Sequence, residues 1–324
     1  GRSVSGGSVV FARVPRVLLV VLAAMLLLPG VAAGAGWLPA QGLVPVGQAG
    51  SLAAAAADGT GTFHVAWATT DAGAAGATIR HAWRAPGGAW QVEDVARVTA
   101  RTPVRVELAA SARGDLVIAW DHLLPTGVAV EASIRPAGGA WSGPGQPCAP
   151  GTSGLPVDDR WLDAAIDGRG RAIVVCVTSG VGVESHEGAA GQPWSGAVLA
   201  GAGAADPHVA MSEDGEAVVA WRGTGIEARH RAAGGAWEPA ITVSGAGTSA
   251  TEPELVAEPG GAFLATWTLY SPGRGLWAAS LPAGGTWTTP VAVSAPVFSL
   301  SSASLGAGGP GGGVAAWAEG SALQ

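Results

Sequence analysis

The stretch "RHRAAGGAWEPAITVS", Arg229 to Ser244, decides the fold because its central Gly-Gly-x-Trp motif recurs along the chain. The motif returns at positions 87–90, 138–141 and 284–287, and a degenerate copy ends at Trp194. Paired glycines supply the positive φ that tight hairpin turns require. Each copy therefore predicts a hairpin turn followed by a strand that opens with tryptophan.

Apolar runs that end in tryptophan alternate with these turns. They read FHVAW, LVIAW, AVVAW, FLATW and GVAAW, and they end at Trp67, Trp120, Trp221, Trp267 and Trp317. The run AIVVC fills the same place in one further unit and ends at Cys176. Self-similarity at about 50 residues is typical of propellers and other repeat arrays.

Each unit is predicted to contain four strands, which the unit around Trp221 shows best. Strands are expected at 207–212, 216–221, 225–231 and 236–244, with turn signals between them. The first strand is built from small residues, the second is apolar at nearly every position, and tryptophan opens the fourth. Sheets stacked around an axis lie closest at the inner strand and farthest apart at the rim, so these sizes place the first strand inside and the tryptophan outside.

The two ends of the chain complement each other. Residues 36–50 resemble a fourth strand without the first three, and residues 301–320 resemble a first and second strand without a fourth. The sequence therefore predicts an all-β fold: a six-bladed β-propeller of four-stranded antiparallel blades, closed by the N-terminal strand (residues 36–50) joining the last blade. Residues 36–324 form one domain in this interpretation. Only SALQ follows the last predicted strand, so a C-terminally truncated fragment of a longer protein stays an alternative.

The N-terminus predicts a secretory signal peptide over residues 1–35. Arg13 and Arg16 precede the apolar run 17–28, whose 12 residues are too few to span a bilayer as a helix. An Ala-x-Ala pattern follows at 33–35, where cleavage is expected. An uncleaved anchor is the alternative. The predicted mature protein is secreted and has no membrane span.

Composition and motifs exclude several function classes. The net charge is −7 and the 17 basic residues form no cluster, which argues against nucleic-acid binding. The six histidines show no metal-ligand spacing, and no phosphate-binding loop or hydrolase nucleophile elbow is present. We expect no cofactor, no metal and a monomer.

The repeat pattern "DG-x-AVVAW … R-x-AGG-x-W" resembles that of secreted six-bladed propeller proteins of bacteria over residues 36–324, and it is broadly similar to sialidase-like propellers. The resemblance implies the architecture. SEDGEAVVAW, at 212–221, departs from the Asp-box Ser-x-Asp-x-Gly-x-x-Trp of the sialidase-like proteins. Sialidases use an arginine triad and a Tyr–Glu nucleophile pair, whereas this chain has a single tyrosine, Tyr270. The resemblance therefore implies no catalytic residue here.

The loops that leave each second strand and enter each first strand should share one end of an antiparallel blade. Polar groups at the mouth of a central channel make a reasonable ligand site. The candidate ligand-binding residues on this loop face are Asp121, His122, Arg222, Tyr270, Glu319, Asp206, Glu252 and Arg160. The competing interpretation is that these loops are polar because they face water.

Three of these candidates have distinct expected roles. Arg222 would hold a carboxylate or a diol through forked hydrogen bonds. Tyr270 offers a ring for sugar stacking, and Asp121 would accept hydrogen bonds from sugar hydroxyls or serve as an acid or base.

The only two cysteines, Cys148 and Cys176, are predicted to form a disulfide, since a secreted protein meets an oxidising compartment. Cys148 is expected in the connection that enters the first strand of the blade containing Cys176. Two unpaired thiols are the alternative.

The leading functional interpretation is a non-catalytic extracellular propeller that binds a glycan, a cell-wall polymer or a protein through the loop face. The alternative is a glycoside hydrolase or lyase that uses carboxylates of the channel face. A third possibility is a structural repeat module of a larger extracellular protein.

Overall fold

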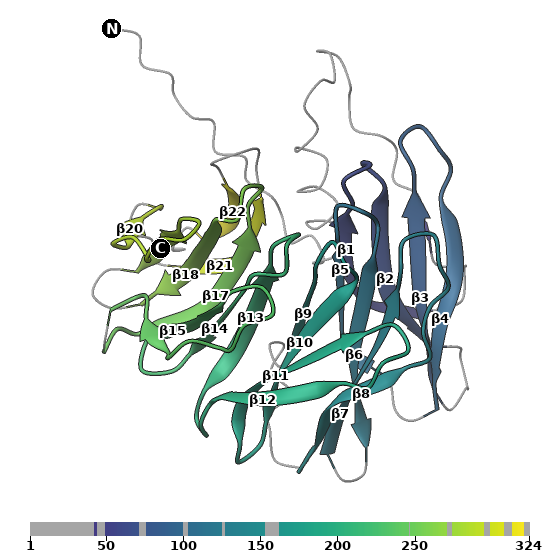
Figure 1. The fold of residues 1–324 in the computed structure, drawn as a ribbon, viewed down its shortest axis with the longest axis horizontal. Helices are drawn as coiled ribbons and strands as arrows, with labels where there is room; N and C mark the ends of the chain where they lie inside the picture. Colours follow the sequence, from purple (N-terminus) through teal and green to yellow (C-terminus); the bar gives the residue numbers. More distant parts are fainter. Residues whose placement is uncertain are drawn as a thin grey trace, which may run out of the picture.

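The described part of the chain consists of β-strands joined by turns and loops (Figure 1). The structure is a computed structural model and describes residues 42–43, 49–70, 76–99, 103–124, 127–152, 162–245, 247–270, 274–294, 299–307 and 313–320. The predicted signal peptide at 1–35, most of the predicted closing strand at 36–50, and Arg160 lie outside these residues. Closure by the N-terminal strand therefore stays a prediction. Over the described ranges, no helix has the length and apolar character needed to cross a membrane.

The strands form six antiparallel sheets that follow one another in sequence. Five sheets have four strands, and within the described residues the sixth has two. The first three sheets comprise β1 (Ala49–Ala57), β2 (Phe63–Thr70), β3 (Ala77–Arg84) and β4 (Gln91–Val98); β5 (Pro103–Ala110), β6 (Leu116–Leu124), β7 (Gly127–Arg135) and β8 (Gly145–Thr152); and β9 (Leu162–Ile166), β10 (Arg171–Thr178), β11 (Gly182–Ala189) and β12 (Ser195–Ala200). The last three comprise β13 (Ala205–Met211), β14 (Ala217–Arg222), β15 (Ile226–Arg231) and β16 (Ile241–Thr242); β17 (Ala250–Ala257), β18 (Phe263–Leu269), β19 (Gly275–Leu281) and β20 (Val291–Ala292); and β21 (Ser299–Ala307) and β22 (Gly313–Gly320).

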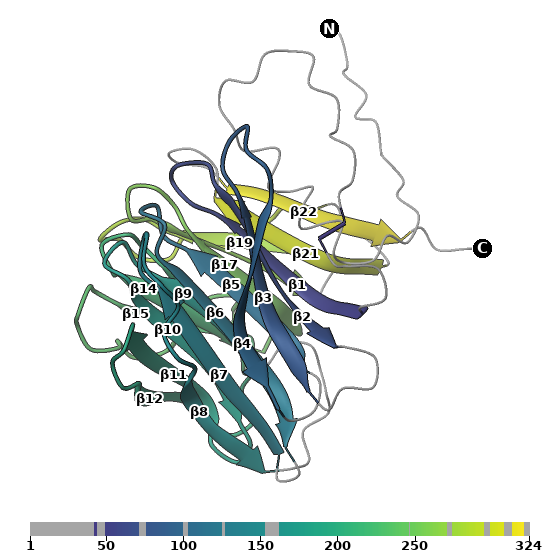
Figure 2. The ribbon, with the colours of Figure 1, turned by 90° about the vertical axis from the view of Figure 1, so that its right-hand side faces the viewer.

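The first strand of each sheet lies innermost. β1 contacts β5, β5 contacts β9, β9 contacts β13, β13 contacts β17, and β17 contacts β21. The sheets thus succeed one another from the purple to the yellow end of the chain, with the later strands of each sheet farther out (Figures 1 and 2). The all-β propeller architecture predicted from the repeats is confirmed.

Tryptophans at two strand positions fill the space between neighbouring sheets. The second-strand tryptophans of the second and fifth sheets face the preceding sheet: Trp120 packs with Ile79, and Trp267 packs with Val218. The tryptophans that follow the hairpin turns, such as Trp237 and Trp287, pack at the edges of the same clusters. This arrangement agrees with the prediction that small side chains lie on the inner strands and tryptophan side chains lie at the rim.

The double-glycine turn depends on its first glycine. Gly87, Gly138, Gly234 and Gly284 all have φ between 64° and 72°, a left-handed conformation that glycine adopts without steric cost. The second glycine is less constrained, since Gln192 takes its place in the third sheet and still donates its N–H to the carbonyl three residues earlier.

The outer strands of the fourth and fifth sheets are shorter than predicted. β16 and β20 contain two residues each, whereas a strand over 236–244 was expected. Pro239 and Pro290 lie just before them and cannot donate a hydrogen bond to a sheet ladder. The residues after Trp237 and Trp287 therefore run along the rim largely outside a regular ladder.

Candidate functional site

The predicted loop face exists, because the end of each second strand lies beside the start of the first strand. Pro103 pairs with His122, Ala205 pairs with Arg222, and Ala250 pairs with Leu269. The loop-face candidates on these strands therefore lie at one end of their sheets.

Arg222 is held by a carboxylate of its own sheet. Its Nε donates to Oδ2 of Asp206 over 2.7 Å. Asp206 is buried and has a φ of 52°, at a point where the pairing register of β13 and β14 shifts. Glu252 occupies the corresponding bulge of the fifth sheet with a φ of 59°. Arg222 therefore fixes a bulge at the start of an inner strand.

Asp121 stabilises a bulge at the corresponding position of the second sheet. Its Oδ1 accepts the backbone N–H of Arg105 over 2.7 Å, at the bulge between Pro103 and Val106. His122 is also buried, and its Nδ1 lies 3.7 Å from Oε2 of Glu131. Asp121 and His122 thus both contact their own sheet.

Tyr270 is the most open of these candidates. Its side chain follows β18 and 40% of the residue is exposed, while its N–H donates to the carbonyl of Ser249. The guanidinium of Arg274 lies 4.5 Å from the ring centroid, so one face of the ring is covered. Glu319 lies in β22 opposite Leu300. Asp121, Arg222 and Tyr270 belong to three different sheets, and a common ligand site for them stays a prediction.

A second polar group, which we call the axial cluster, comprises Arg105, Glu107, Asp163, His208 and Glu254. Glu107, Asp163, His208 and Glu254 occupy one equivalent position in the inner strands β5, β9, β13 and β17. Arg105 forms an ion pair with Glu107. His208 Nδ1 lies 3.4 Å from Asp163 Oδ2 and 3.9 Å from Glu254 Oε2. The cluster thus links the inner strands of four sheets.

The environment of the axial cluster shifts the pKa values of Glu107 and His208. Burial raises the pKa of the Glu107 carboxyl; Arg105 opposes this shift and Asp163 adds to it. Burial also acts to lower the pKa of His208, but Glu254 and Asp163 outweigh it and the pKa is raised. The raised pKa favours the neutral form of the Glu107 carboxyl. None of the cluster residues was among the ligand-binding candidates chosen from the sequence. The available signal was a charged residue or histidine within stretches of small and apolar residues, such as VELAA and LDAAI.

A hydrogen-bonded chain of imidazoles lies in the first sheet and reaches the second. Asp58 Oδ2 is 3.4 Å from His64 Nε2, His64 Nδ1 is 3.0 Å from His81 Nε2, and His81 Nδ1 is 2.9 Å from Glu93 Oε1. Arg135 of the second sheet donates to the same Glu93 oxygen over 2.8 Å. Burial lowers the pKa of both histidines, that of His81 to about 4, and the charge of Arg135 acts in the same direction.

Cys148 and Cys176 are joined by a disulfide that links two sheets. The sequence placed Cys148 in the connection into the third sheet, and this placement is wrong. Cys148 lies in β8, the outer strand of the second sheet, opposite Val130. Cys176 occupies the strand position that holds tryptophan in other sheets and faces the second sheet in the same way. The disulfide thus takes the place of a tryptophan contact between neighbouring sheets.

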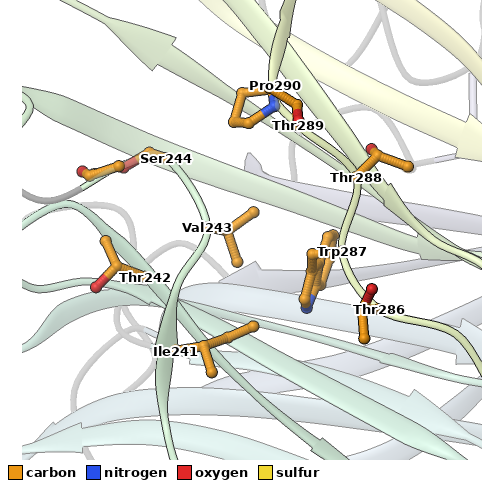
Figure 3. A pocket seen from close by; sticks show the side chains of 10 residues that line it. Ile241, Thr242, Val243, Ser244, Thr286, Trp287, Thr288, Thr289 and Pro290 are labelled. Carbon is orange, nitrogen blue, oxygen red and sulfur yellow. The ribbon is translucent and has the colours of Figure 1, made fainter.

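A groove at the rim lies between the fourth and fifth sheets (Figure 3). It has a volume of about 450 Å³, and no charged side chain lines it. The lining residues are Ile241, Thr242, Val243, Ser244, Gly245, Thr286, Trp287, Thr288, Thr289 and Pro290. Figure 3 shows the indole of Trp287 across from Val243 and Ile241, with threonine side chains on both walls.

Hydrogen bonds fix both walls of the groove. Ser244 Oγ accepts the N–H of Ile226 over 2.8 Å, and Thr288 Oγ1 accepts the N–H of Ser280 over 3.0 Å. Both walls therefore hold their shape without a ligand.

The groove lies beside a tryptophan whose sheet has leucine where three other sheets have arginine. We call the tryptophan that follows each hairpin turn the rim tryptophan. In the first, second and fourth sheets, the residue six positions before it is arginine, and the guanidinium lies over the indole. The distance from Cζ to the ring centroid is 5.9 Å for Arg84, 5.2 Å for Arg135 and 4.9 Å for Arg231. In the fifth sheet this residue is Leu281, which is buried in the apolar cluster between the sheets. Position 281 therefore supplies no guanidinium to Trp287, whose half-buried indole packs against that cluster and lines the groove.

Comparisons with known proteins identify the fold. No protein-family model matches the chain, and no curated protein matches its sequence. Among solved structures, the chain is similar to the BP39L lectin from Burkholderia pseudomallei, with 15% identity, a TM-score of 0.53, and coverage of 82% of this chain and 81% of the lectin. It is also similar to a protein of unknown function from Dyadobacter fermentans (13% identity, TM-score 0.50, covering 78% and 85%) and to a leech intramolecular trans-sialidase (10% identity, TM-score 0.49, covering 79% and 63%). At these identities, the likeness to the lectin and to the Dyadobacter protein shows a β-propeller fold and does not show an activity.

Proposed function

We propose that this protein is a secreted, non-catalytic propeller that binds glycans, and that the rim groove at Trp287 is a binding site. The observation that carries the proposal is the half-buried indole of Trp287, which lines the groove opposite Ile241 and Val243 and has leucine in place of the arginine of three other sheets. The structural likeness to a lectin supports glycan binding as a class. Secretion rests on the predicted signal peptide at 1–35.

The chemistry of the groove fits a neutral sugar. A pyranose ring has an apolar C–H face, which stacks on an indole, and hydroxyls around its edge, which bond to polar groups. Thr242, Thr286 and Thr289 are exposed and line the same groove as the indole. A volume of about 450 Å³ lies within the range typical of small-molecule sites. Without a cation in its lining, the groove offers no counter-charge to a sialylated or sulfated glycan.

A glycan array followed by calorimetry tests the proposal. The mature protein should bind neutral glycans, and Trp287→Ala should weaken binding at least about tenfold, which corresponds to about 1.4 kcal/mol. Trp237→Ala is the matched control, because that tryptophan has the same position in the fourth sheet but is covered by Arg231. Equal affinity of wild type and Trp287→Ala would contradict the proposed site.

The same array tests the predicted loop-face site. Arg222→Ala, Tyr270→Ala and Asp121→Ala should weaken binding if the ligand lies at the channel mouth, with Arg84→Ala as a rim control. Loss in these variants and none in Trp287→Ala would move the site to the loop face.

Hydrolysis of a glycoside is the second candidate function, and the axial cluster favours it. A carboxyl with a raised pKa, Glu107, lies in one cluster with Asp163 and Glu254. Glycoside hydrolases use such a protonated acid beside an ionised carboxylate. A panel of fluorogenic glycosides should detect turnover that Glu107→Gln abolishes. Absence of turnover across the panel supports the non-catalytic interpretation.

A further inference from the structure

The interface between the second and third sheets brings two sulfurs and an imidazole together. Cys148 of β8 and Cys176 of β10 are both buried, and His186 of β11 lies beside them. The two Sγ atoms and a ring nitrogen of His186 all lie within 4.8 Å of one another. The Nε2 atom of His186 is buried and makes no hydrogen bond within the described residues.

The surrounding residues make room for the imidazole. His186 pairs with Gly196 of the outer strand, and a Cβ at Gly196 would lie 2.5 Å from two atoms of the ring. Farther along β11, the ring of Trp194 lies against Gly188 and Gly145 in the same way. Glycines thus allow a ring to lie flat at this interface, where Cys176 replaces the tryptophan of other sheets.

We infer that Cys148, Cys176 and His186 form a redox-gated site for zinc or a similar thiophilic divalent cation. In zinc sites the Zn–S distance is about 2.3 Å and the Zn–N distance about 2.0 Å, so tetrahedral donors lie roughly 3.5–3.8 Å apart. The three donors lie within 4.8 Å of one another, and reduction breaks the bond between the two sulfurs so that they can separate to the spacing of a tetrahedral site. Three protein ligands leave the fourth position to water or to a ligand.

The disulfide and the metal exclude each other. A phosphine or dithiol reductant supplies two electrons, and two protons complete the two thiols: Cys–S–S–Cys + 2e⁻ + 2H⁺ gives two Cys–SH. Zn²⁺ then binds the two thiolates and the imidazole, and the two thiol protons leave to solvent. In either state the same residues connect β8 to the third sheet, so the interface stays cross-linked after reduction when metal is present.

The test uses the mature protein reduced with a phosphine in metal-free buffer and titrated with Zn²⁺ or Co²⁺. Reduced wild type should bind one cation per chain, and the Co²⁺ form should show thiolate charge-transfer and tetrahedral d–d absorption. The oxidised protein should show neither. His186→Ala should weaken binding at least about tenfold, whereas His230→Ala, a histidine on the third strand of the fourth sheet, should leave it unchanged.

A thiol-protection assay keeps the inference testable if reduction loosens the fold. Reduced protein is mixed with Zn²⁺ and then alkylated, and the modified cysteines are counted by mass spectrometry. Zn²⁺ should slow alkylation of both cysteines in wild type and less in His186→Ala. Equal alkylation rates with and without Zn²⁺, or one-to-one binding by His186→Ala at wild-type affinity, would overturn the inference.

Discussion

Arg222 donates to Asp206 over 2.7 Å, and this ion pair fixes a left-handed residue at the start of an innermost strand. Asp206 is buried, so removal of Arg222 deprives its carboxylate of a hydrogen bond that offsets the cost of its desolvation. We expect Arg222→Ala to lower the free energy of unfolding by roughly 1–2 kcal/mol in denaturant titrations. Arg169→Ala serves as the control, because Arg169 and its partner Asp214 are largely exposed at 4.0 Å. An equal effect of the two variants would show that the bulge contact adds nothing.

The disulfide should contribute substantially to stability because it joins two sheets across a separation of 28 residues. Closing a loop of this size in the unfolded chain corresponds to roughly 3–4 kcal/mol. Reduction in the presence of a metal chelator should lower the denaturation midpoint of wild type. The double variant Cys148→Ser with Cys176→Ser should not respond to reductant. Detection of two free thiols in protein secreted under oxidising conditions would contradict the bridge.

Acidification should destabilise the fold through the buried histidine pair. His81 has its pKa lowered to about 4, and that of His64 is lowered as well, so the unfolded chain binds protons near pH 6.5 that the folded chain does not. For His81, this contribution to stability is complete above about pH 6.5 and is lost as the pH falls towards 4, by about 1.4 kcal/mol per pH unit; His64 acts in the same direction. Asp58, Glu93 and Arg135 are the charged groups that face the pair.

The variant His81→Phe separates this pair from other acid-sensitive groups. It keeps a ring beside Trp83 but cannot take up a proton. Its free energy of unfolding should vary less with pH between 6.5 and 4 than that of wild type. The raised pKa of His208 acts oppositely, since its contribution is present below pH 6.5 and is lost as the pH rises through the folded value. Parallel pH profiles of wild type and His81→Phe would contradict the role assigned to His81.

The sequence was sufficient for the repeat and its turns because these signals are local. The positive φ at Gly234 and the packing of Trp237 follow from a few neighbouring residues. The position of Cys148 did not follow, since Pro147 and Pro150 obscured the strand signal of β8. The short outer strands β16 and β20 also differ from the prediction because a proline precedes each of them.

The candidate sites were harder to predict because each requires residues from different sheets. Glu107 and His208 lie in different inner strands, and only the stacking of four sheets makes them parts of one cluster. The rim groove had a readable signal, since Leu281 interrupts the arginine found six residues before Trp90, Trp141 and Trp237. The sequence alone did not show what this replacement changes, because only the structure places those arginines over the indoles.

The most direct test of the proposed function is the affinity of the variant Leu281→Arg for a neutral glycan selected on the array. This substitution restores the arginine that covers the indole in three other sheets while Trp287 itself stays in place. Calorimetry should show at least about a tenfold loss of affinity, equal to that of Trp287→Ala, with circular dichroism unchanged from wild type. If the buried arginine disturbs folding, Trp287→Ala tests the same site without introducing a charge. Wild-type affinity in both variants would contradict glycan binding at the groove.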